Sequence, residues 1–81
     1  MITPKNLIRH ELIGLEVEVV NAKSVNQVGI KGTIVEETNN TLVVDTPKGE
    51  KTVLKNNVTF RFTLENQMVD VDGERLVGKP E

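Results

Sequence analysis

Residues 58–64 alternate between apolar and polar side chains, and this alternation constrains the fold more than any other feature of the chain. The apolar members are Val58, Phe60, Phe62 and Leu64, and polar residues stand between them. A period of two places every second side chain on one face of an extended strand. We therefore predict a β-strand here, with both phenylalanines facing the core.

Shorter stretches repeat this pattern, and turn signals recur about every ten residues. The predicted strands cover residues 16–19, 28–37, 42–45, 51–54, 58–64 and 68–72, and residues 76–77 can add a short final piece. Thirteen valines among 81 residues favour strands, because β-branched side chains suit a pleated surface. Gly32 lies inside one predicted strand and indicates a sharp bend. About six short antiparallel strands favour a closed or nearly closed barrel, which also protects the sheet edges.

The first fourteen residues carry the signals of a short helix. Thr3 suits the N-cap, Pro4 suits the first helical position, and Gly14 can provide a left-handed stop. We expect one domain over residues 1–81, with a helix at 1–14 and a barrel at 15–81.

The composition excludes several classes of function. Without cysteine there are no disulfides, no thiolate catalysis and few routes to a zinc site, and we expect no metal and no cofactor in this chain. No apolar run approaches the roughly 18 residues of a membrane helix, and the start of the chain lacks a secretory signal. The expected location is cytoplasmic, with no membrane partner.

Catalytic residues are scarce. Ser24 is the only serine and His10 the only histidine, and a triad needs both held beside a carboxylate. The carboxylate pairs Glu16/Glu18 and Asp70/Asp72 have the spacing of residues that share the outer face of a strand. We predict no active site in this chain.

The net charge of −2 hides a segregated pattern. Basic segments at 1–10, 19–35 and 46–64 alternate with acidic segments at 11–18, 36–45 and 65–74. The basic side chains can either form one face of the barrel or be scattered solvating charges; they are Lys5, Arg9, Lys23, Lys31, Lys48, Lys51, Lys55 and Arg61. With no Tyr or Trp and both Phe residues in the predicted core, there is no aromatic platform for bases. Contact with RNA would then use phosphates and shape.

Several segments together resemble a known family. They are Leu7–Leu15 with its His-Glu-Leu-Ile-Gly, Gly29–Thr38 with the following Asn40-Thr41-Leu42, Phe60-Arg61-Phe62, Val71-Asp72-Gly73 and Gly78-Lys79-Pro80. In this order they are similar to the archaeal ribonuclease P protein component 1, counterpart of a eukaryotic subunit shared by ribonucleases P and MRP. The resemblance covers nearly the whole chain.

The resemblance implies a mainly β fold, a small Sm-like barrel preceded by a short helix. It implies a non-catalytic subunit of ribonuclease P, the endoribonuclease that removes the 5′ leader from precursor tRNA. The implied partners are the ribonuclease P RNA and a small zinc-binding protein subunit that forms a heterodimer with it, with precursor tRNA contacted indirectly.

The resemblance also implies roles for individual residues. The implied RNA-binding residues are Lys5, Arg9, Lys31, Lys55, Arg61 and Lys79. The implied partner-binding residues are Leu7, Ile8, Leu12, Ile30 and Ile34. From the residues alone, Ile30 and Ile34 fit the barrel core equally well, and Arg61 fits a cross-strand ion pair.

Other functions stay open at this point. Gly29-x-x-Gly32-x-x-Val35 faintly resembles the turn of KOW barrels, RNA-binding modules of the translation and transcription machinery. An SH3-like module that binds only protein is a further alternative. A self-contained ribonuclease has the least support, because no acid/base pair with plausible geometry emerges.

Overall fold

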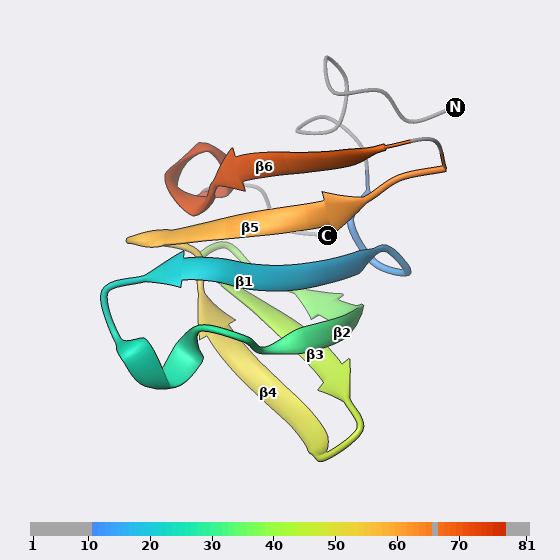
Figure 1. The fold of residues 1–81 in the computed structure, drawn as a ribbon, viewed down its shortest axis with the longest axis horizontal. Helices are drawn as coiled ribbons and strands as arrows, with labels where there is room; N and C mark the ends of the chain where they lie inside the picture. The colour runs from blue at the N-terminus through green and yellow to red at the C-terminus, as the bar shows by residue number, and fades with distance from the viewer. Residues whose placement is uncertain (1–10, 66, 78–81) are drawn as a thin grey trace.

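The computed structural model describes residues 11–65 and 67–77, and its main feature is one antiparallel sheet of six strands (Figure 1). The strands are β1 (Glu16–Ala22), β2 (Lys31–Glu37), β3 (Thr41–Thr46), β4 (Gly49–Leu54), β5 (Val58–Thr63) and β6 (Met68–Asp72). Two 3-10 turns, η2 (Val25–Gln27) and η3 (Gly73–Leu76), complete the described elements. The predicted mainly β fold is confirmed. The possible strand at 76–77 is wrong, because Leu76 ends η3.

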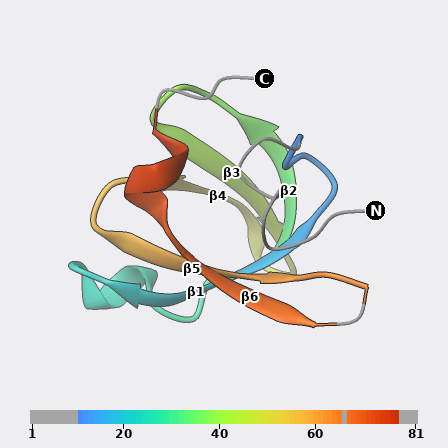
Figure 2. The same cartoon turned by 90° about the horizontal axis from the view of Figure 1, so that it is seen from above.

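The strand order is β4-β3-β2-β1-β5-β6, so the first strand of the sheet lies at its centre. β1 pairs with β2 on one side and with β5 on the other. Register shifts interrupt the ladder between Val19 and Asn21 and between Ile34 and Glu36, and such irregularities bend a sheet. Figure 2 shows the result: the sheet curls until β2, β3 and β4 face β1, β5 and β6.

The corner predicted at Gly32 lies where β2 changes its neighbour. β2 pairs with β1 through residues 31–33 and with β3 from Thr33 onward. A Cβ atom on Gly32 would lie 1.9 Å from the carbonyl oxygen of Asp45, which no side chain can occupy. Glycine is therefore required here, because the backbone of β2 passes directly against that of β3.

The core fills the space between the two halves of the curled sheet. Phe60 and Phe62 are fully buried with ring centroids 6.2 Å apart, as their alternation predicts. The other buried apolar residues come from every strand and from both flanking segments; they are Leu12, Val17, Val19, Ile34, Leu42, Val44, Val53, Val58, Leu64, Val71 and Leu76. This aliphatic interior is what a valine-rich, aromatic-poor chain can build.

Closure of the barrel by strand pairing is not shown. Within the described residues, the edge strands β4 and β6 form no ladder with each other. The residues that directly follow these strands lie close together: a Cβ atom on Gly73 would lie 1.8 Å from the carbonyl oxygen of Lys55. Since η3 follows β6 at this point, the two edges are joined by a tight backbone contact and by side chains.

The predicted helix at 1–14 lies mostly outside the described residues. The described part, residues 11–14, is a turn rather than a helix: Leu15 N–H donates to Leu12 O at 3.1 Å and Gly14 N–H to Ile34 O at 2.8 Å. Gly14 has the left-handed φ of +96° predicted for a stop. At Gly14, the hydrogen bond to Ile34 of β2 takes the place of a helical one. In the described part of the chain, no helix is long and apolar enough to span a membrane.

Candidate nucleic-acid interface

A cleft lies between the segment that enters β2 and the β3–β4 hairpin, and three lysines line it. Its volume is about 600 Å³. The lysines are Lys31, Lys48 and Lys51; Glu16, Val28, Ile30 and Pro47 are among the other lining residues. A concave surface with several converging cations concentrates positive potential, which is what a phosphate backbone requires.

The hairpin that carries two of these lysines is held by its own hydrogen bonds. Thr46 Oγ1 donates to Gly49 O at 2.6 Å and accepts from the Lys48 backbone N–H at 3.2 Å. Gly49 has φ +113°, a conformation that favours glycine. These hydrogen bonds therefore fix the backbone position of Lys48 in the turn. Lys51 follows among the first residues of β4.

Lys51 reaches the cleft because of its position along β4. It has the same strand parity as Val53, whose side chain is buried, and it pairs in register with the buried Val44. Lys51 itself is exposed because it lies at the open end of the curled sheet. Lys51 therefore lines the cleft from this end of β4.

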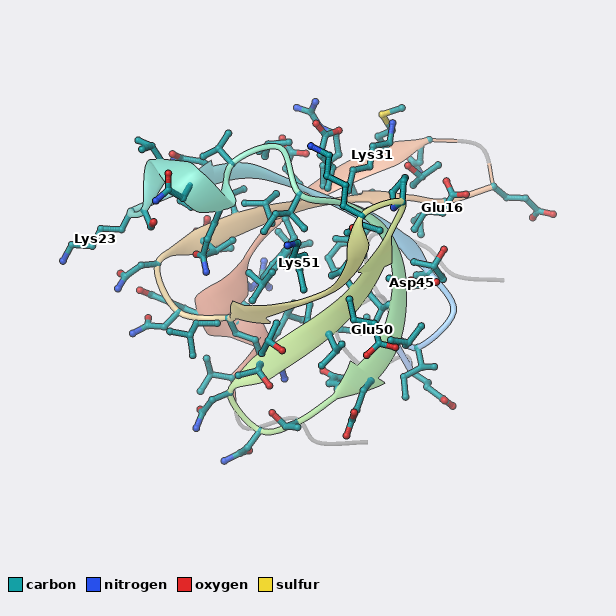
Figure 3. The ribbon with its side chains drawn as sticks, turned by 90° about the horizontal axis from the view of Figure 1, so that it is seen from below. Glu16, Lys23, Lys31, Asp45, Glu50 and Lys51 are labelled. Carbon is teal, nitrogen blue, oxygen red and sulfur yellow. The ribbon has the colours of Figure 1, made fainter. Side chains whose placement is uncertain are left out.

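The three lysines are available for a ligand. Across residues 11–65 and 67–77, the structure places no carboxylate within ion-pair distance of Lys31, Lys48 or Lys51. In Figure 3, Lys31 and Glu16 lie on the same side, while Lys23 lies at the far end of the molecule. Lys23 lines two other, more open hollows beside η2 and β5.

Arg61 is placed differently from these lysines, because an aspartate occupies its guanidinium group. Arg61 Nε donates to Asp70 Oδ1 at 2.8 Å and Nη2 to Asp70 Oδ2 at 3.2 Å. These hydrogen bonds, followed by the charge attraction, raise the pKa of Arg61, and the same hydrogen bonds lower the pKa of Asp70. On the other side, Glu18 of β1 is the cross-strand neighbour of Arg61. The cross-strand alternative for Arg61 is what the structure shows.

Lys55, predicted to bind RNA, is in the interior. Its side chain is fully buried, and Nζ donates to Glu37 Oε2 at 3.0 Å and to Leu76 O at 2.8 Å. This corrects the prediction. Lys55 has the inward parity of β4, and η3 covers its end of the strand, so the ammonium group cannot meet an external phosphate.

The predicted partner-binding residues also divide into buried ones and ones at the surface. Leu12 and Ile34 are fully buried in the core, so they are corrected to structural residues. Ile30 is half-buried and lines the lysine cleft. Leu7, Ile8, Lys5, Arg9 and Lys79 lie outside the described residues.

Two exposed apolar residues directly follow the buried Leu12 and Ile34 in the sequence. Ile13 and Val35 are 38% and 40% exposed, and they adjoin the backbone pairing of Gly14 with Ile34. The register shift beside Ile34 turns Val35 outward. Sequence reasoning missed this pair, because a bulge cannot be located from alternation alone.

Sequence reasoning also placed Lys48 and Lys51 only among the general basic residues. The proximity of residues 28–33 to residues 46–51 would have identified them, but it depends on the corner at Gly32. Among the described residues, no group of three or more His, Cys, Asp or Glu side chains could hold a metal ion.

The curled six-stranded antiparallel sheet with a lysine-lined cleft makes this a small, mainly β protein. The model of the family "Ribonuclease P/MRP, subunit p29" matches residues 5–81. The chain therefore belongs to the ribonuclease P/MRP subunit p29 family.

Individual relatives agree with this assignment. Ribonuclease P protein component 1 of Methanosphaera stadtmanae is 51% identical over 82 residues, covering 100% of this chain and 88% of the relative. The protein of the same name from Methanocaldococcus jannaschii is 50% identical and covers 100% of this chain and 86% of the relative.

A solved structure is also similar. Mth11, described as a homologue of the human RNase P protein Rpp29, superposes with a TM-score of 0.64 at 40% identity, covering 89% of this chain and 95% of that one. The resemblance seen in the sequence is thus confirmed, and the family assignment favours it over the KOW and SH3-like alternatives.

Proposed function

We propose that this chain is a non-catalytic subunit of ribonuclease P that binds the ribonuclease P RNA through the lysine cleft. It supports removal of the 5′ leader from precursor tRNA, while catalysis belongs to the rest of the holoenzyme. The observation that carries the proposal is the convergence of Lys31, Lys48 and Lys51 on one cleft in a member of this family. The subunit needs no cofactor of its own and acts in the cytoplasm.

Electrostatics supports the cleft over the remainder of the described surface. The outer face of β1, β5 and β6 carries Glu18, Asp70 and Asp72, and its one arginine is paired. An RNA backbone would be repelled there and attracted at the cleft. The overall charge of −2 is compatible with RNA binding because three lysines line one cleft, whose lining includes Glu16 as its one carboxylate.

The test is affinity for the ribonuclease P RNA in a salt titration with the full chain. Lys48→Gln with Lys51→Gln should weaken binding at least several-fold and reduce its salt dependence, since two phosphate contacts are lost. Lys23→Gln is the matched control, because Lys23 is exposed and lies away from the cleft. Unchanged affinity and salt dependence in the double variant would refute the RNA role of the cleft.

We further propose that the small zinc-binding subunit docks beside the turn that precedes β1, on Ile13 and Val35. The exposed apolar area of these side chains suits a protein partner, and it replaces the buried Leu12 and Ile34 as the candidate surface. Val35→Asp should lower the affinity for that subunit by about tenfold or more in calorimetry. Val25→Asp is the control, because Val25 is 80% exposed on η2; equal effects of both variants would argue against this surface.

A further inference from the structure

The lysine cleft offers more space than contact with phosphates alone requires. Its volume of about 600 Å³ lies in the range of pockets that enclose small molecules. A duplex backbone can be held by exposed lysines on a flat or convex surface, and no hollow is required for that. A hollow of this volume leaves room for part of the RNA to enter the cleft.

One wall of the cleft is apolar. Val28, which is 46% exposed, and the half-buried Ile30 lie on the segment that enters β2, and Pro47 of the β3–β4 hairpin also lines the cleft. An exposed aliphatic wall gains free energy when a flat apolar surface covers it. A nucleobase has such a face, and aliphatic side chains can cover it where no aromatic ring is available. The cleft thus combines a surface for a base with cations for its phosphates.

Glu16 is the unexpected member of the lining. A carboxylate in a phosphate site repels the ligand, and the described part of the structure shows no ion pair between Glu16 and the cleft lysines. An ionised carboxylate can only accept hydrogen bonds, through two oxygens side by side. A ligand that offers two adjacent N–H donors would satisfy both oxygens.

Among the four RNA bases, guanine has that arrangement on its Watson–Crick edge. Its N1–H and its 2-amino group point the same way, whereas uracil offers a single N–H between two carbonyl acceptors. Adenine and cytosine each offer one amino group beside an acceptor nitrogen. A carboxylate therefore favours guanine, and a well-formed bidentate pair discriminates by about 1–3 kcal/mol, or roughly 5- to 150-fold.

We propose that the cleft takes one unpaired guanine nucleotide of the RNA. The base covers Val28, Ile30 and Pro47, its Watson–Crick edge meets Glu16, and the flanking phosphates meet the lysines. The nucleotide must be unpaired, because pairing would hide the edge that Glu16 reads. This inference rests on the proposed RNA-binding function and adds a base preference to it.

The experiment measures binding of the full chain to RNA hairpins that differ in one bulged nucleotide. The bulge is G, A, C or U, and a fully paired hairpin completes the set. The bulged-G hairpin should bind about tenfold more tightly than the bulged-U hairpin. Glu16→Gln should bring the two affinities close together, because the amide replaces one acceptor with a donor.

Glu50→Gln is the matched control for the carboxylate. Glu50 is exposed on the edge strand β4 and does not line the cleft, so its variant should keep the guanine preference. The amide signals of Gly29 and Thr33 in NMR spectra should shift when the bulged-G hairpin is added. The signal of Val69 on β6 serves as the distant reference.

Equal affinity for all four bulges would overturn the proposal, as would a guanine preference that survives Glu16→Gln. If either result came with lysine- and salt-dependent binding, the proposed RNA-binding function would remain standing. If Lys48→Gln with Lys51→Gln changed no affinity, the RNA-binding function itself would fail. The two ideas are therefore separable in one set of titrations.

Discussion

The ammonium nitrogen of Lys55 lies 3.0 Å from Glu37 Oε2, with both side chains fully buried. Glu37 ends β2 and Lys55 directly follows β4, so the pair connects two strands across the interior. Lys55 Nζ also donates to Leu76 O at 2.8 Å and thereby attaches η3 to the same point. This contact closes one end of the curled sheet where strand pairing does not.

Lys55→Met should destabilise the protein strongly. Removing the cation leaves the Glu37 carboxylate buried without its partner, and breaking a buried pair costs about 3–5 kcal/mol. One oxygen of that carboxylate, Oε1, already has no hydrogen-bond partner within the described structure. Urea unfolding should therefore show a large drop in the free energy of unfolding.

Two variants sharpen this test. Lys51→Met removes an exposed lysine of β4 that has the same parity as Lys55, and we expect a change within about 0.5 kcal/mol in the free energy of unfolding. Adding Glu37→Met to Lys55→Met should recover much of the lost stability, because no buried charge remains. A double variant no more stable than Lys55→Met would contradict the assignment of the cost to an unpaired charge.

Gly73→Ala should also be destabilising, for a steric reason. The new Cβ would lie 1.8 Å from Lys55 O and 2.9 Å from a ring carbon of Phe60, so the contact between the ends of β4 and β6 must open. We expect a loss of about 2 kcal/mol or more, measured by thermal or urea unfolding. Glu74→Ala, at the exposed next position, should have little effect.

The pH dependence of stability should contain a contribution from Asp70. Its folded-state pKa is lowered below 3.8, first by the hydrogen bonds from Arg61. The stabilisation is therefore complete above pH 3.8 and is lost as the pH falls through the lower folded-state pKa. An NMR titration of the Asp70 carboxyl carbon should show this pKa, and Arg61→Gln should return it toward 3.8. The effect on stability should be small, because both side chains are solvent-exposed.

The salt dependence of RNA binding should distinguish free cations from paired ones. Neutralising one cleft lysine, as in Lys51→Gln, should lower the slope of log affinity against log salt concentration by about 0.7–0.9. Arg61→Gln should lower it less, because Asp70 already holds the guanidinium group. A larger change for Arg61→Gln than for Lys51→Gln would mean that Arg61 leaves Asp70 to contact RNA.

Sequence periodicity predicted the strands well where one face is buried. The alternation over residues 58–64 located β5, and Gly32 located the corner in β2, because both depend on local chemistry. The secondary structure at Leu76 was harder to predict, since an apolar residue after a turn fits a strand and a 3-10 turn equally. Its burial comes from long-range packing of η3 against the ends of β4 and β5.

The candidate site was less accessible to sequence reasoning. Lys51 lies on β4 and Lys55 directly follows that strand with the same parity, yet Lys51 is exposed and Lys55 is buried beneath η3. Sequence alone assigns both to a basic segment, and only the curl of the sheet separates them. The same curl brings Glu16 to the cleft from a strand that reads as an acidic outer face.

The strand order also has a consequence for how the protein is made. β1 is the first strand to be synthesised, but its second neighbour, β5, begins at Val58. β2, β3 and β4 can pair as they emerge, because consecutive strands need only short turns. The central strand must wait for β5, so the core can be completed on the ribosome only after residues 58–63 have been synthesised.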